Sequence, residues 1–202
     1  MIRMLLPLAL ALSACAATTP DVTRAPVATV ALYPGETTGV RALVNKWADY
    51  YDVPRSLLHR VIQRESDYRA DARNGPYWGM MQILPATARG VNFRGEPSRL
   101  LDADTNLRYA ARYLRGAWIV SGGDEQAAMM WYARGYYYEA KRQGVLYETG
   151  LRGGMWAEHD AGRPAMVPLD ARGRPMPRMA AAEPDCAPAR GLARLVSGDA
   201  CA

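Results

Sequence analysis

Apolar residues recur at three- and four-residue steps between residues 40 and 143, and this spacing predicts a series of amphipathic helices. The expected helices cover about residues 43–51, 55–66, 78–89, 105–120, 125–134 and 135–142. A break at residues 52–54 should separate the first two, and Asp104 and Asp124 can cap the fourth and the fifth. Because no alternating apolar pattern of useful length predicts a strand, we expect a mainly α domain with little or no strand.

Glu65 places a charge on an apolar face of the second expected helix. That face is otherwise made of Leu58, Val61 and Ile62, at three- and four-residue steps. A carboxylate in such a place is costly to desolvate unless it is paired or protonated, so burial should raise the pKa of Glu65. A carboxylic acid that keeps its proton near neutral pH can serve as a general acid. An ion pair with a nearby Arg, or a position at the rim of the helix, would explain the spacing equally well.

The composition fits a single globular domain and excludes several classes of site. A chain of 202 residues with a net charge of +5 favours anionic partners only weakly, and its basic residues are scattered, so we expect no nucleic-acid partner. The two histidines form no cluster with the three cysteines, so we expect neither a metal nor another cofactor. The 12 Tyr and 5 Trp suit a groove that stacks on sugar rings. We expect a monomer.

The first 15 residues have the pattern of a secretory signal, with a charge at Arg3 and an apolar run over residues 5–12 that is too short to span a bilayer. The run ends in the letters LSAC, which resemble the lipobox of bacterial lipoproteins, where the Cys becomes lipid-modified. Ordinary cleavage beside small residues is the alternative. The resemblance implies a periplasmic protein anchored through a lipid on Cys15, and the two alanines after it fit the outer membrane. Membrane contact would be through this lipid only.

Composition also divides the rest of the chain. Residues 16–39 are rich in Ala, Thr, Pro and Gly and are predicted to be a tether, followed by a folded helical domain over residues 40–146. Residues 147–202 show little periodicity and are predicted to be a loosely ordered extension. Within it, Cys186 and Cys201 could form a disulfide in an oxidising compartment, and two free thiols are the alternative.

Three short motifs occur in a fixed order along the expected helices. They are the pair Glu65-Ser66, the run GMMQI at residues 79–83 and the run WYARG at residues 131–135. In this order they resemble the soluble lytic transglycosylase family, whose pattern is ES, then GLMQ, then AYNAG. The resemblance covers about residues 40–143 and implies a lysozyme-like, mostly helical fold.

The resemblance also implies an activity on the glycan strands of peptidoglycan. Glu65 would protonate the oxygen of the β-1,4 bond between N-acetylmuramic acid and N-acetylglucosamine, and the 2-acetamido group of the substrate would stabilise the cation. Glu65 would then take the proton of the C6 hydroxyl, so that a 1,6-anhydro ring closes without water. The implied substrate-binding residues are Ser66, Asn74, Met81, Gln82 and Tyr132. Among them, Gln82 would donate to a sugar and the Tyr132 hydroxyl would orient the acid.

The sequence departs from the family pattern at several positions, which leaves other functions open. Ala133 stands in the place of the Asn of the third motif, and Tyr77 and Trp78 replace small residues before the second. One alternative is therefore a catalytically weak, peptidoglycan-binding envelope lipoprotein. A hydrolytic muramidase of the lysozyme type is another, and it would need a second carboxylate. Asp67 would lie on the opposite face of the helix from Glu65, whereas Asp71 lies in an expected loop.

Overall fold

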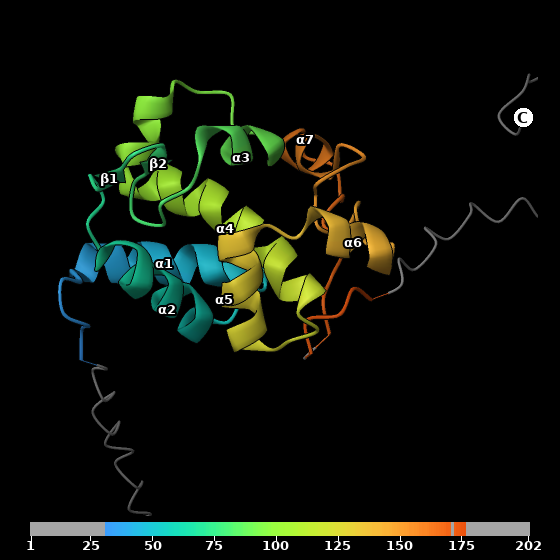
Figure 1. Cartoon of the computed structure of the whole chain (residues 1–202), viewed down its shortest axis with the longest axis horizontal. Helices are drawn as coiled ribbons and strands as arrows, with labels where there is room; N and C mark the ends of the chain where they lie inside the picture. The colour runs from blue at the N-terminus through green and yellow to red at the C-terminus, as the bar shows by residue number, and fades with distance from the viewer. Residues whose placement is uncertain (1–30, 171, 177–202) are drawn as a thin grey trace, which may run out of the picture. The chain divides into compact units, whose positions relative to one another are not determined.

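The computed structural model describes residues 31–170 and 172–176, and the elements of this part are mainly helical (Figure 1). The elements are α1 (Thr38–Tyr50), α2 (Arg55–Ser66), β1 (Arg73–Asn74), β2 (Tyr77–Trp78), α3 (Pro85–Gly90), the 3-10 helix η1 (Pro97–Leu101), α4 (Ala103–Val120), α5 (Glu125–Arg134), α6 (Tyr137–Gln143) and α7 (Met155–Asp160). The two strands have two residues each and pair antiparallel. The predicted mainly α fold with little strand is confirmed.

Helix α4 is the centre of the fold and packs against α1, α3, α5 and α6 (Figure 1). Its apolar line is buried as the spacing predicts, and it consists of Leu107, Ala110, Ala111, Leu114 and Trp118. The cap of this helix is Asp102, two residues before the expected Asp104, and its side chain accepts a 2.8 Å hydrogen bond from the backbone N–H of Thr105. At α5 the predicted cap is confirmed, since Asp124 accepts a hydrogen bond from the N–H of Ala127.

Helices α1 and α2 bury the faces that their sequence pattern predicts. In α2, Leu58, Val61 and Ile62 are buried, and Glu65 follows them one turn later, near the end of the helix. In α1, Val44 and Trp47 are buried, whereas Tyr50, three residues after Trp47, is 50% exposed and its hydroxyl contacts His159 at 3.0 Å. Helix α2 extends from the core to the surface, and Glu65 lies near its surface end.

The GMMQ segment is not helical, in contrast to the helix expected over residues 78–89. β1 and β2 form a hairpin, residues 79–83 turn back so that Trp78 and Ile83 pair, and a helix begins only at Pro85. Gly79 has φ +74°, and a Cβ at this position would collide with the backbone of Leu100 and the side chain of Asn106. The local spacing of the apolar residues could not reveal this turn, because it depends on contacts with residues far along the chain.

The predicted tether over residues 16–39 is wrong from Tyr33 onward. The Glu36 carboxylate is fully buried and forms an ion pair with Arg41, and it accepts a 2.9 Å hydrogen bond from the backbone N–H of Tyr33. The ring of Tyr33 stacks on Tyr68 with centroids 6.1 Å apart. A buried ion pair thus fixes a segment whose Gly- and Thr-rich composition suggested a linker. Residues 16–30 and Cys15 lie outside the described residues.

The predicted loose extension over residues 147–202 is also wrong for its first part. Trp156 in α7 is only 2% exposed and packs edge-on against Tyr51, with ring centroids 5.5 Å apart. Arg112 of α4 donates a 2.9 Å hydrogen bond to Asp160, and the buried Arg115 donates to the carbonyl of Val167. These long-range partners hold a segment that has little periodicity of its own. Residues 177–202, with Cys186 and Cys201, lie outside the described residues.

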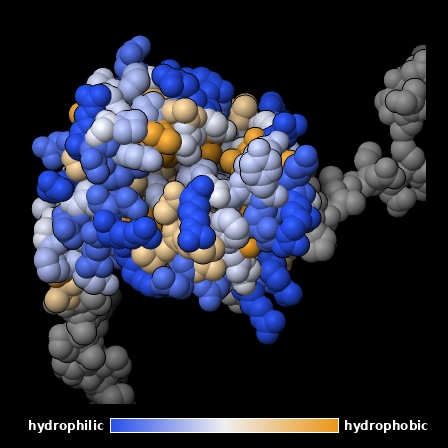
Figure 2. Space-filling model, viewed as in Figure 1, coloured by the Kyte–Doolittle hydropathy of each residue, from blue (hydrophilic) through white to orange (hydrophobic). Residues whose placement is uncertain are grey.

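The face of the described part in Figure 2 is mostly hydrophilic, with small separate hydrophobic spots. Within residues 31–170 and 172–176, no helix has both the length and the apolar character needed to cross a membrane.

Candidate active site

Glu65 opens into a groove that is made of two adjoining hollows. The two hollows share four lining residues, Tyr77, Gln82, Tyr132 and Ala133. The first hollow, of about 340 Å³, is lined in addition by Arg64, Glu65 and Asn74. The second, of about 270 Å³, continues past Thr87 and Tyr113 to Arg134 and Gly135. The groove therefore brings the end of α2, the β hairpin with its GMMQ turn, and the end of α5 together.

The carboxylate of Glu65 is partly withdrawn from water, because its side chain is only 23% exposed. Burial raises the pKa of Glu65, and the positive charge of Arg64, whose Nε lies 3.9 Å from Oε1, opposes this shift only in part. Among the described residues, no side chain or backbone group makes a hydrogen bond to the Glu65 carboxylate. The expected rise in the pKa of Glu65 is confirmed. Its cause is burial, and the charge of Arg64 reduces the rise only in part.

Two buried side chains fix the GMMQ turn against the helices. Ser66 donates a 2.7 Å hydrogen bond to the carbonyl of Met80. Asn106 in α4 accepts a 2.9 Å hydrogen bond from the N–H of Met81 and donates to the carbonyls of Trp78 and Leu100. Sequence reasoning gave Asn106 no role, although a polar residue beside the buried Leu107 was a signal of one.

Ser66 and Met81 differ from their predicted roles as substrate-binding residues. Ser66 is buried and its hydroxyl is engaged, and neither residue lines the groove. The side chain of Met81 packs fully in the core, so only its backbone takes part in the site. Ser66 and the backbone of Met81 help to hold the turn in which Gln82 lines the groove.

Gln82 lines both hollows with its donors already in use. Its side-chain nitrogen donates to the carbonyls of Ala72 at 3.2 Å and of Gly79 at 2.8 Å. A side-chain amide has two N–H donors, so both are engaged and only the amide oxygen remains free to accept. The expected sugar donor is thus an acceptor in this structure. Its backbone adopts φ +48°, a left-handed conformation that the two hydrogen bonds stabilise.

Tyr132 joins α5 to the GMMQ turn beneath Glu65. Its hydroxyl donates a 2.9 Å hydrogen bond to the carbonyl of Met81, and its ring meets Tyr113 edge-on at 5.5 Å. Burial raises the pKa of Tyr132 well above its ordinary value, so the phenol stays neutral. Because its proton is directed at Met81, the hydroxyl can act on Glu65 only through its oxygen.

A single carboxylate lines the groove in the part of the chain that the structure describes. Asn74 lines the first hollow from β1, near Glu65, whereas Asp67 and Asp71 are exposed and outside the lining. Glu65 is thus the only acid among the residues that line either hollow. No group of three or more potential metal ligands occurs within the described residues.

The family comparison decides the classification. A family model described as the transglycosylase SLT domain matches residues 42–145, slightly more than half of the chain. The chain belongs to the SLT transglycosylase family. The match includes all three motifs and every residue that lines the groove. Among solved structures, none gives a significant match.

Membership of the SLT family supports a peptidoglycan-acting function of the lytic transglycosylase type. The SLT domain of this chain also has ordered parts beyond the matched residues. Tyr33 and Glu36 precede the match, and Trp156 and Asp160 follow it, yet all four contact residues within it. The folded unit is therefore larger than the family domain.

Proposed function

We propose that the protein is a lytic transglycosylase that cleaves the β-1,4 bond between N-acetylmuramic acid and N-acetylglucosamine in peptidoglycan, with Glu65 as its only acid and base. One observation carries this proposal: Glu65 is a half-buried acid with a raised pKa, and it is the only carboxylate among the described residues that line the groove. A retaining hydrolase usually needs two carboxylates, one on each side of the bond. A reaction in which the substrate supplies the second group needs one.

The proposed reaction uses the carboxyl group of Glu65 twice, first as an acid and then as a base. Glu65 protonates the bridging oxygen, and the bond from that oxygen to C1 of the muramic acid breaks. The 2-acetamido group of the same sugar stabilises the cation at C1. The C6 hydroxyl oxygen then bonds to C1 and returns its proton to Glu65, which closes the 1,6-anhydro ring. An attack from within the sugar has a large effective concentration compared with water.

The other residues that line the groove are suited to bind the sugar chain and to hold the site in place. The Gln82 amide oxygen, with both N–H donors engaged, is suited to accept a hydrogen bond from a sugar hydroxyl. Tyr77 is 43% exposed and lines both hollows, so its ring offers a stacking surface where they meet. Asn74 offers an amide beside Glu65. Tyr132 holds the GMMQ turn in place through its hydrogen bond to the carbonyl of Met81.

The test is product release from purified sacculi by the wild type and by Glu65→Gln. We expect the wild type to release 1,6-anhydro muropeptides, and Glu65→Gln to release none while it unfolds at a similar temperature. Glu125→Gln is a matched control, because Glu125 lies on α5 outside the groove lining and pairs with Arg60. Undiminished release by Glu65→Gln would refute the assignment of Glu65.

One observation favours a second candidate, a peptidoglycan-binding lipoprotein with weak catalysis. No described residue hydrogen-bonds the Glu65 carboxylate, and Ala133 provides no polar group where the family has Asn, so the acid is less firmly oriented. This candidate predicts that the protein sediments with sacculi and releases few or no muropeptides, and that Glu65→Gln binds equally well. Efficient release by the wild type that is lost in Glu65→Gln would exclude it.

We also propose that the protein is a periplasmic monomer held to the outer membrane by a lipid on Cys15, which lies outside the described residues. The lipobox-like run at residues 12–15 supports this location. Membrane fractionation of cells expressing the wild type and Cys15→Ala tests it. Wild-type protein should sediment with outer membranes, and Cys15→Ala should not. Equal sedimentation of the two would contradict the lipid anchor.

A further inference from the structure

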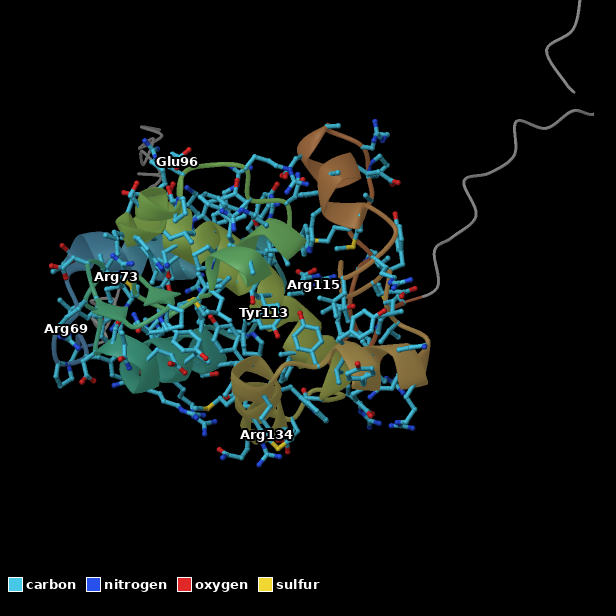
Figure 3. All side chains as sticks on the ribbon, turned by 45° about the horizontal axis from the view of Figure 1, so that its top comes forward. Arg69, Arg73, Glu96, Tyr113, Arg115 and Arg134 are labelled. Carbon is cyan, nitrogen blue, oxygen red and sulfur yellow. The ribbon has the colours of Figure 1, made fainter. Side chains whose placement is uncertain are left out.

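Each hollow of the groove contains one arginine. Arg64 lines the hollow of Glu65, and Arg134 lines the second hollow. The side chain of Arg64 is 52% exposed, and its nearest acid is Glu65 itself, at 3.9 Å. Arg134 is exposed and forms no ion pair with any described residue. Figure 3 shows Arg134 projecting outward from the end of α5.

Other arginines of the domain form close ion pairs with acids outside the groove lining, whereas Arg64 has only its 3.9 Å contact with Glu65 and Arg134 has no ion pair among the described residues. Such close pairs include Arg41–Glu36, Arg55–Asp49, Arg60–Glu125, Arg112–Asp160, Arg142–Glu139 and Arg174–Asp170. When Glu65 carries its proton, the described residues of the groove lining include two positive charges and no negative charge. The charge of the groove therefore favours anionic ligands.

The glycan backbone cannot use these charges. Its N-acetylated sugars are neutral, and the carboxylates of peptidoglycan belong to the peptide stems attached to the lactyl groups of muramic acid. A guanidinium binds a carboxylate through two parallel hydrogen bonds and stays charged at every relevant pH. Charged groups at the rim of a binding site contribute to partner selection as well as to affinity.

We propose that Arg64 and Arg134 bind the carboxylates of peptide stems, so that the groove selects glycan strands bearing anionic stems over neutral ones. The strand's identity as peptidoglycan rests on the proposed function. The two arginines lie in different hollows, with Tyr77, Gln82, Tyr132 and Ala133 shared between them, so each can meet a different stem of one strand. Ala133 and Gly135, on either side of Arg134, add little bulk there.

Binding to modified strands tests this without relying on turnover. The protein carries Glu65→Gln throughout, so that strands stay intact. Soluble strands with stems are first acetylated on their amines, and half are then converted to methylamides at their carboxylates. Binding to both is measured for the Glu65→Gln protein, for the same protein with Arg64→Gln and Arg134→Gln, and for a matched control with Arg142→Gln and Arg163→Gln. The control removes the same net charge from outside the groove lining.

We expect the groove double variant to bind acidic strands three- to tenfold more weakly, as loss of two exposed ion pairs implies. It should bind the methylamide strands as its parent does, and the parent should prefer acidic strands, less so at high salt. The control should match the parent on both. Equal binding of both strands by the parent, or equal weakening by the control, would overturn the role of these arginines. Loss of all strand binding by the parent would instead count against the proposed function.

Discussion

The phenol of Tyr132, on α5, donates a 2.9 Å hydrogen bond to the backbone carbonyl of Met81, in the GMMQ turn. This bond joins the wall of the groove that carries the third motif to the wall that carries the second. Ser66, which follows Glu65, holds the same turn through Met80. The three motifs are therefore connected physically as well as in sequence order, and their contacts meet at the turn beneath the acid.

Removing the Tyr132 hydroxyl should weaken both the fold and the reaction. Tyr132→Phe leaves the buried carbonyl of Met81 without its partner, which costs about 1–3 kcal/mol of unfolding free energy. We expect a lower urea midpoint and slower muropeptide release. Tyr138→Phe, at a side chain that is 84% exposed, serves as the control and should change neither. Equal behaviour of the two variants would show that the bond to Met81 is unimportant.

Asn106 should be more sensitive, because its amide makes three hydrogen bonds to the backbone around the turn. Asn106→Ala removes all three from a fully buried site, and we expect a loss of about 3 kcal/mol or more. Unfolding in urea measures this, and Asn45→Ala on α1, a partly exposed residue, provides the comparison. If the two substitutions cost the same, the turn does not depend on Asn106.

The ion pair between Arg112 and Asp160 should make stability depend on acid pH. Burial alone would raise the pKa of Asp160, but hydrogen bonds from Arg112 and Asn92 lower it to about 2. A depressed carboxyl pKa contributes stability that is complete above the ordinary value near 4 and is lost as the pH falls toward 2. Asp160→Asn should therefore lose stability at pH 7, by about 3 kcal/mol, because Arg112 stays buried.

Urea unfolding at pH 7 and at pH 3 distinguishes this pair from an ordinary surface contact. The difference between the two pH values should be smaller for Asp160→Asn than for the wild type. Asp49→Asn breaks an exposed pair with Arg55 and should have little effect at either pH. An unchanged pH dependence in Asp160→Asn would mean that α7 is held by its apolar contacts alone.

Arg64 should set the alkaline limit of activity through its charge on Glu65. Burial raises the pKa of Glu65, and Arg64 lowers it in part. Arg64→Gln should therefore raise this pKa further and move the alkaline limb of the kcat profile to higher pH, because the acid keeps its proton longer. Arg60→Gln, in the same helix but paired with Glu125, should leave the limb in place. An unchanged limb in Arg64→Gln, or a shift to lower pH, would contradict this effect of the Arg64 charge.

The sequence predicted those parts of the fold whose pattern is local. Helices α2 and α4 follow from their periodic apolar residues, and Asp124 caps α5 as expected. The GMMQ turn was predicted as helix, because its two methionines and isoleucine have a spacing that a helix would also bury. Its left-handed residues, Gly79 and Gln82, depend on contacts with the distant Asn106 and Ala72.

The ordered segments at both ends were missed for the same reason. Asp160 meets Arg112 across 48 residues, and Val167 meets Arg115 across 52, so no window of sequence reveals that these segments are folded. In the site, the spacing of Glu65 with apolar residues predicted burial and left an ion pair with Arg or a rim position open, and the structure shows a partly buried carboxylate 3.9 Å from Arg64. The direction of the Gln82 amide did not, because it depends on two backbone carbonyls that only the folded chain brings near.

The most direct test of the central claim is digestion of sacculi in water enriched in heavy oxygen, followed by mass spectrometry of the released muropeptides. If Glu65 works alone and the C6 hydroxyl is the nucleophile, the wild type releases anhydro products without the isotope, and Glu65→Gln releases none. Muramic acid ends that carry the heavy oxygen would show that water attacks C1, and would contradict the single-carboxylate mechanism.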